Sequence, residues 1–137
     1  MYKRIGVPVD LEHPQRLSKA LATASALAAT FGASVHLVAV TSPSPGTVAP
    51  DPEAFGERLA AYADECSARH KAVFTPHLRV CDDPATELDR TLSEAFHALE
   101  TDLVVVASHV PGLREYVFSS NGGWLASHTD LSVFVVR

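Results

Sequence analysis

The apolar and polar positions of the chain follow two periods in turn, which predicts strands that alternate with helices. Residues 2–9 place apolar side chains at every second position, and residues 34–41 are rich in β-branched side chains, as in strands. Between them, residues 14–31 carry apolar side chains at three- and four-residue intervals, which is typical of a helix. Gly32 is a suitable end for that helix.

The middle of the chain repeats this alternation. Residues 42–52 form a polar, proline-rich stretch that indicates a loop, and residues 52–71 have the apolar spacing of a helix. Residues 74–80 predict a shorter strand. Pro76 lies inside that strand and cannot donate a ladder hydrogen bond, so the strand is expected at an edge of the sheet.

The last third of the chain predicts two more strands and two more helices. Asp83 and the proline that follows it form a strong helix start, with the aspartate as N-cap. The uninterrupted apolar run at residues 102–107 is typical of a strand buried on both faces. Residues 119–128 predict a helix, and residues 131–136 a final strand.

This order of elements predicts an α/β fold in a single domain of residues 1–137. Alternating strands and helices imply a doubly wound, five-stranded parallel sheet of order 3-2-1-4-5, with helices on both faces, as in Rossmann-like folds. Ligands of such sheets bind beyond the carboxyl ends of the strands, where the winding reverses. We therefore expect a site between the first strand, which ends at Pro8-Val9-Asp10, and the fourth, which ends at Ala107-Ser108.

Composition narrows the class of partner. The net charge is −5, and the 11 lysines and arginines are scattered, which argues against nucleic acid because phosphate backbones require a basic face. The first residues lack the long apolar region of a signal peptide, and no apolar stretch is long enough to span a bilayer. We expect a cytoplasmic protein that does not insert into membranes.

Common catalytic motifs are absent from the sequence. There is no GxxxxGK[ST] phosphate loop, no GxGxxG after the first strand, no GxSxG elbow and no HExxH. Cys66 and Cys81 do not have the spacing of a metal site. With no base or nucleophile identified, binding is a better class than catalysis, and ATPase activity is at most weak.

Several polar residues are expected at this crevice. Asp10 ends the first strand, where its carboxylate suits a ribose hydroxyl or a phosphate-bound metal, although it could equally start a loop or cap a helix. Ser119, Ser120 and Asn121 suit the N-terminus of the last helix, where free amides attract an anion. They could instead only cap that helix, or Asn121 could begin a hairpin turn. His109 is either a phosphate contact or an ordinary surface residue.

Three segments resemble the universal stress protein family. The start, YKRIGVPVDL, is similar to the family's first strand, which ends in Pro/Ala-x-Asp. The segment VHLVAV is similar to its second strand. Residues 102–137 are similar to its signature region, with a strand, a loop, a helix and a last strand in register. The likeness is nearest to a branch with an A-S-H-x-P loop and an S-N helix start.

The resemblance implies an adenine nucleotide alpha hydrolase-like fold and a regulatory domain that binds ATP, with Mg or Mn as an accompanying metal. It also implies a homodimer through the last strand, Leu131 to Val136, and an additional protein partner. In this chain the site residues would be Pro8, Val9, Asp10 and Val40 on the adenine and ribose side, and Ala107, His109, Val110, Ser119, Ser120 and Asn121 on the phosphate side.

The phosphate loop departs from the family's glycine pattern. Ala107, Val110 and Ser119 stand where the family has glycines, which allow close backbone approach and positive φ. An alternative therefore stays open, in which the chain is a stress-response interaction module that binds no nucleotide.

Overall fold

The computed structural model describes residues 1–108 and 116–137, and the side chains of residues 1–108 and 122–137. The order of elements is β1 (Arg4–Pro8), a 3-10 helix η1 (Pro14–Leu17), α1 (Ser18–Phe31), β2 (Ser34–Thr41), α2 (Pro52–His70), β3 (Phe74–Val80), α3 (Pro84–Ala98), β4 (Leu103–Ala107), α4 (Tyr116–His128) and β5 (Ser132–Val136).

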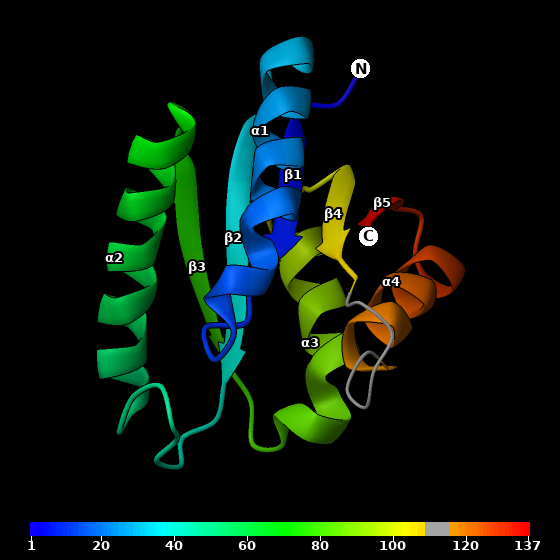
Figure 1. Cartoon of the computed structure of the whole chain (residues 1–137). Coiled ribbons are helices and arrows are strands. Elements are labelled where there is room, and N and C mark those ends of the chain that lie inside the picture. The colour runs from blue at the N-terminus through cyan, green and yellow to red at the C-terminus, as the bar shows by residue number, and fades with distance from the viewer. Residues whose placement is uncertain (109–115) are drawn as a thin grey trace.

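The strands form one parallel sheet with the order β3-β2-β1-β4-β5, which confirms the doubly wound topology expected from the sequence (Figure 1). Ile5 of β1 pairs with Val35 of β2 on one side and with Leu103 of β4 on the other. The winding therefore reverses at β1 and β4, as predicted. β3, with its Pro76, lies at one edge of the sheet, and β5 lies at the other.

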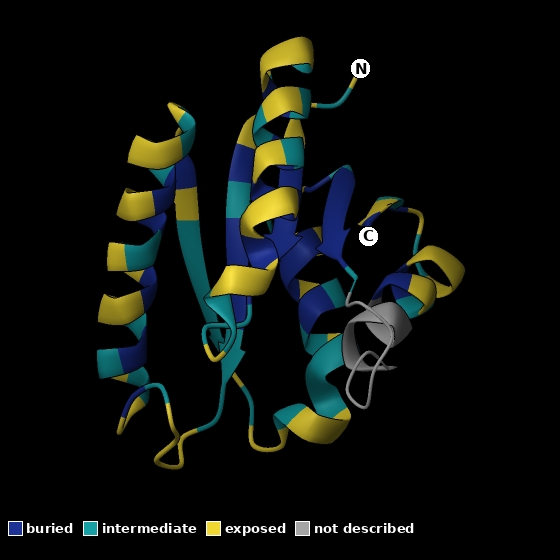
Figure 2. Cartoon of the chain, viewed as in Figure 1, coloured by how far each residue is buried: buried dark blue, intermediate teal, exposed yellow. Residues whose placement is uncertain are grey.

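Helices cover both faces of this sheet (Figure 1). One buried cluster joins α1 and α2 to the sheet through side chains such as Leu21 and Leu59. A second cluster joins α3 and α4 to the opposite face through Phe96 and Leu125. All five residues of β4 are buried (Figure 2), because its side chains alternate between the two clusters. This two-sided burial is the reason for the uninterrupted apolar run in the sequence.

Two glycines are required by the backbone geometry. Gly32 ends α1 with φ of +67°, a left-handed conformation that side chains with a Cβ rarely adopt, as the sequence predicted for this helix end. Gly6 lies in β1 beneath α3, and a Cβ on it would stand 2.5 Å from Cε1 of Phe96. The absence of a side chain at Gly6 therefore allows α3 to pack closely on the sheet.

Two helix starts differ from the sequence-based expectation. The first turn of the helix expected over residues 14–31 is a separate 3-10 helix, η1, and the α-helix begins at Ser18. Asp83 occupies the N-cap position of α3, as predicted, but its carboxylate accepts a hydrogen bond from the Thr86 hydroxyl at 2.9 Å rather than from a backbone amide.

In the described part of the chain, no helix combines the length and the apolar character needed to cross a bilayer.

Candidate functional site

A pocket of about 360 Å³ opens at the carboxyl ends of β1 and β2, the lower end of the sheet in Figure 1. It lies at the edge of the sheet where ligands of doubly wound folds bind. The β2–α2 loop and the N-terminal half of α3 close its sides. The lining comprises Pro8, Val9, Asp10, Leu11 and Glu12 after β1, Val38, Val40, Thr41 and Ser42 of β2, Gly46, Thr47, Val48, Ala49 and Phe55, and Pro84, Ala85, Leu88 and Leu92 of α3.

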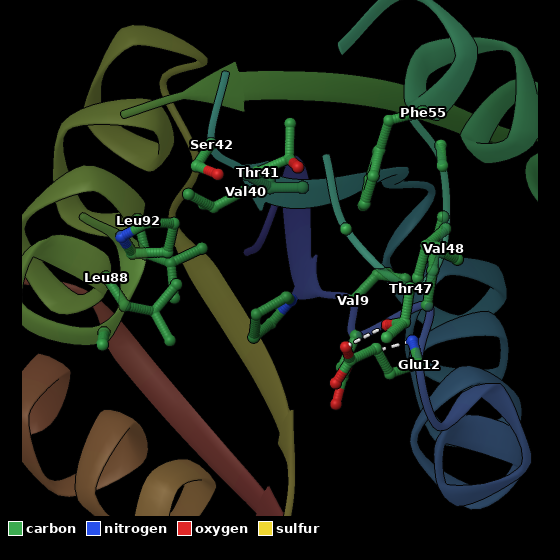
Figure 3. A pocket seen from close by; sticks show the side chains of 18 residues that line it. Val9, Glu12, Val40, Thr41, Ser42, Thr47, Val48, Phe55, Leu88 and Leu92 are labelled. Atoms are coloured by element: carbon green, nitrogen blue, oxygen red, sulfur yellow. Dashed lines mark hydrogen bonds between the residues drawn. The ribbon is translucent and has the colours of Figure 1, made fainter. Parts of the chain in front are cut away.

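The walls of the pocket are mainly apolar. Figure 3 shows Leu88 and Leu92 of α3 on one side, and Val48 and Phe55 on the other, with Val40 between them. Flat aromatic ligands suit two facing apolar walls, because they bury a large area on both faces. The shape and lining of this part of the pocket fit a planar heterocycle.

Asp10 lies at the rim of the pocket and is held by its own loop. Its Oδ1 accepts a hydrogen bond from the backbone N–H of Glu12 at 2.9 Å, and its Oδ2 lies 3.1 Å from Nδ1 of His13. The Asp10 and His13 side chains are both about one-third exposed. The turn that follows β1 thus fixes the carboxylate in place, and an ionised carboxylate has lone pairs left for a ligand hydroxyl.

The second carboxylate of the rim joins the β2–α2 loop to this turn. The hydroxyl of Thr47 donates a hydrogen bond to Oε1 of Glu12 (Figure 3). Glu12, Asp10 and His13 each offer one ligand atom within 4.8 Å of the others, so the three side chains could share a metal ion. Their two carboxylates are the kind of ligand that Mg²⁺ prefers.

The charge of the pocket is negative within the part of the chain that the structure describes. Asp10 and Glu12 line it, and no described lysine or arginine does. The pocket therefore has an apolar interior for a neutral ring and an acidic rim that suits hydroxyl groups or a cation.

The structure brings four of the sequence-predicted site residues together. Pro8, Val9, Asp10 and Val40 all line the pocket, at the ends of the two neighbouring strands β1 and β2. Ala107 ends β4 and is buried, but it does not belong to the lining. The described lining thus lies on the β2 side of β1, and not between β1 and β4 as the sequence predicted, because α3 and the β2–α2 loop enclose the space beyond β2.

The expected start of the last helix needs correction. α4 begins at Tyr116, so Ser119, Ser120 and Asn121 lie inside the helix and are not its N-cap. The free amides of a helix belong to its first residues, which end here at Phe118. The hairpin alternative at Asn121 is also wrong, because α4 continues through it to His128. His109 and Val110 lie outside the described residues.

Sequence reasoning missed most of the pocket walls. Phe55 lies in the helix predicted over residues 52–71, and Leu88 and Leu92 lie in the helix predicted to start at Asp83, but neither helix was expected to contribute to the site. The loop residues Thr47 and Val48 carried no recognisable motif. Their common signal is topological, because the β2–α2 loop and the start of α3 both adjoin strand ends at the carboxyl edge of the sheet.

Comparison with solved structures finds the same fold in universal stress proteins. A universal stress protein solved in complex with cAMP has a TM-score of 0.72 and 17% sequence identity, over 99% of this chain and 97% of that one. The protein from Archaeoglobus fulgidus in complex with dAMP has a TM-score of 0.68 and 18% identity, over 99% and 98%. The Arabidopsis thaliana family protein with AMP bound has a TM-score of 0.56 and 13% identity, over 98% and 90%.

The sequence itself matches the universal stress protein family over residues 1–137. The family match and the sheet order agree with each other, and both agree with the resemblance carried by the first strand and the C-terminal region. The chain belongs to the universal stress protein family.

Proposed function

We propose that this chain is a regulatory domain that binds an adenine nucleotide in the pocket at the ends of β1 and β2. The observation that carries the proposal is the pocket itself, which combines two facing apolar walls with a fixed carboxylate, Asp10, at its rim. An adenine ring fits between the walls, and a ribose hydroxyl fits beside Asp10.

Three relatives of the same fold support this choice of ligand. They were solved with cAMP, dAMP and AMP, and these ligands share an adenine base, a furanose ring and a single phosphate. The apolar walls of Val48, Phe55, Leu88 and Leu92 would hold the part that these ligands have in common. In this proposal the base and the sugar provide most of the recognition.

ATP with a divalent metal is the finer form of the proposal. The acidic rim repels additional phosphates unless a cation lies between, because like charges at close range are unfavourable. Asp10, Glu12 and His13 have the spacing to hold such a cation. A bound Mg²⁺ or Mn²⁺ would supply charge neutralisation there. We therefore expect ATP to bind more tightly with metal than without it, and AMP to depend little on metal.

A homodimer through β5 belongs to the same proposal. β5 is an edge strand, and Phe134 and Val135 are 45% and 44% exposed. An open edge with exposed apolar side chains on both of its faces is suited to pairing with a second copy. A dimer would bury these side chains and satisfy the free backbone groups of the edge.

Calorimetric titration of freshly desalted protein tests the proposed function. We expect saturable heat with AMP and with Mg-ATP, and a rise in melting temperature with the same ligands. Absence of both responses at millimolar nucleotide, in protein that mass spectrometry shows to be free of bound nucleotide, would reject nucleotide binding. The second candidate function, an interaction module that binds no nucleotide, would then replace it. The observation in its favour is that no lysine or arginine of the described residues lines the pocket.

A further inference from the structure

A pair of histidines lies outside the pocket, on the strands β2 and β3. Nδ1 of His36 and Nε2 of His77 are 2.9 Å apart, and both side chains are half-buried. In the parallel register, His77 pairs with Val38, so His36 and His77 are diagonal neighbours on one face of the sheet. Each imidazole therefore directs one ring nitrogen toward the other.

The other ring nitrogen of His36 is also fixed. Its Nε2 lies 2.9 Å from Oγ of Ser34, on the same strand. Histidines that bind metals commonly have their second nitrogen held in this way, because the outer hydrogen bond fixes the tautomer and the orientation of the ring. A proton on Nε2, donated to Ser34, leaves the lone pair of Nδ1 directed at His77.

Both imidazoles favour the neutral form, which is the form that binds metals. Burial lowers the pKa of His36, with a further contribution from Arg4. Burial likewise lowers the pKa of His77, followed by the effects of His36 and Arg79. Solvent still reaches the pair, because both histidines are only partly buried. Water could therefore complete the coordination of a bound ion.

We propose that His36 Nδ1 and His77 Nε2 together bind one divalent transition-metal ion, with Zn²⁺ as the representative case. Two nitrogens on a tetrahedral Zn²⁺ lie about 3.3 Å apart at the usual bond lengths. The rings then need to separate by a few tenths of an ångström from their present contact and to turn until both lone pairs point at one ion. Their half-buried positions on β2 and on the edge strand β3 leave room for this movement. In the bound state each ring carries its proton on the outer nitrogen, and no net proton is released.

The surroundings determine which metals suit the site. Two imidazoles without a carboxylate favour Zn²⁺, Ni²⁺ or Cu²⁺ over Mg²⁺ or Ca²⁺. The guanidinium of Arg4 hydrogen-bonds to Leu99 O at 2.9 Å and to Glu100 Oε2 at 3.1 Å, and Arg79 hydrogen-bonds to Leu78 O at 3.1 Å. These cations repel a metal ion, so binding should be weaker than at a closed structural zinc site.

Titration with Zn²⁺ alone, without nucleotide, tests the proposal. Besides any binding at Asp10, Glu12 and His13, we expect a saturable Zn²⁺ site in the wild-type protein. This site should be lost in the double variant His36→Gln/His77→Gln and retained in His97→Gln, which alters an exposed histidine of α3. Ser34→Ala should weaken binding by about 10-fold. Unchanged Zn²⁺ affinity in the double variant, or no binding to the wild type, would overturn the assignment and leave the pair as a simple hydrogen bond between neutral rings.

A measurement on the wild-type protein covers the case in which the double variant fails to fold. Amide resonances of residues 34–38, of Thr75 and of residues 77–79 should shift together as Zn²⁺ is added. Shifts confined to residues 10–13 would place the ion at the acidic rim of the pocket and would contradict the proposal.

Discussion

Thr47 is hydrogen-bonded through its hydroxyl to the carboxylate of Glu12, which joins the β2–α2 loop to the turn after β1 (Figure 3). The two residues are 35 positions apart in sequence, and both line the pocket. This contact holds the loop, with Val48, over the apolar interior. The geometry of the pocket therefore depends on a polar contact at its rim.

Removal of this hydroxyl should weaken nucleotide binding with little effect on folding. A single exposed hydrogen bond contributes roughly 0.5–1.5 kcal/mol, so Thr47→Val should raise the Kd for AMP by about two- to tenfold. Calorimetric titration measures the change. Thr30→Val, which removes an exposed hydroxyl in the last turn of α1, outside the pocket lining, serves as the control. Equal affinities in the two variants would show that the loop contact does not matter for binding.

Gly6→Ala should destabilise the fold. The added Cβ would meet Cε1 of Phe96 at 2.5 Å, so α3 or the Phe96 ring must shift. Overpacking of this kind typically costs about 1–3 kcal/mol. Gly123→Ala is the matched variant, because its Cβ meets nothing within 4 Å. This helical position should gain roughly 0.5–1 kcal/mol. Urea unfolding measures both, and a stable Gly6→Ala protein would show that the contact between α3 and β1 is adjustable.

Asp89→Asn should stabilise the protein at neutral pH. Burial raises the pKa of the Asp89 carboxyl, which His128 opposes only in part, and Oδ1 has no hydrogen-bond partner among the described residues. Because the pKa of Asp89 is higher in the native state, its carboxyl ionises at a lower pH in the unfolded chain. The contribution of Asp89 to the free energy of unfolding is therefore complete at low pH and is lost as pH rises through the native pKa.

Urea unfolding at pH 4, 5.5 and 7 checks the direction of this pH dependence. The stability difference between Asp89→Asn and wild type should grow with pH, whereas Asp64→Asn, at an exposed position of α2, should show little effect. A difference that shrinks as pH rises would mean that the ionised carboxylate is stabilised in the native state.

A charge on the edge strand β5 should prevent the proposed dimer. Phe134→Lys places an ammonium group where pairing with a second copy would bury the side chain, and lysines on edge strands oppose such pairing. Sedimentation velocity should then give a monomer. Val80→Lys alters a similarly exposed apolar residue on β3, at the opposite edge, and should leave the dimer intact. A monomeric wild-type protein would contradict the proposal that β5 is an interface.

The sheet order was predictable because the strands differ in their burial. The uninterrupted apolar run of β4 indicates a strand buried on both faces, while Pro76 marks an edge. The start of α4 was not predictable in this way. Tyr116, Val117 and Phe118 are apolar and lack a capping residue type, whereas the polar residues that follow are good N-cap types. Local propensity therefore placed the helix start three residues too late.

The part of the pocket that is formed by strand ends was predictable from the sequence. Asp10 and Val40 follow from the topology, because parallel strands bring their carboxyl ends to one edge. Leu88 and Thr47 were not predictable, because their place in the pocket depends on how α3 and the β2–α2 loop fold back over β2. Such contacts come from tertiary packing, which a single sequence does not encode as a local pattern.

The affinity of two tryptophan variants of α3 for AMP tests the central claim most directly. Ala85 is exposed and lines the pocket, and Ala98 is exposed at the other end of the same helix, outside the lining. Both substitutions add the same indole to α3, so they differ mainly in whether it enters the pocket. We expect Ala85→Trp to abolish calorimetric binding of AMP and Ala98→Trp to bind like the wild type. Equal AMP affinity in the two variants would contradict the assignment of this pocket as the nucleotide site.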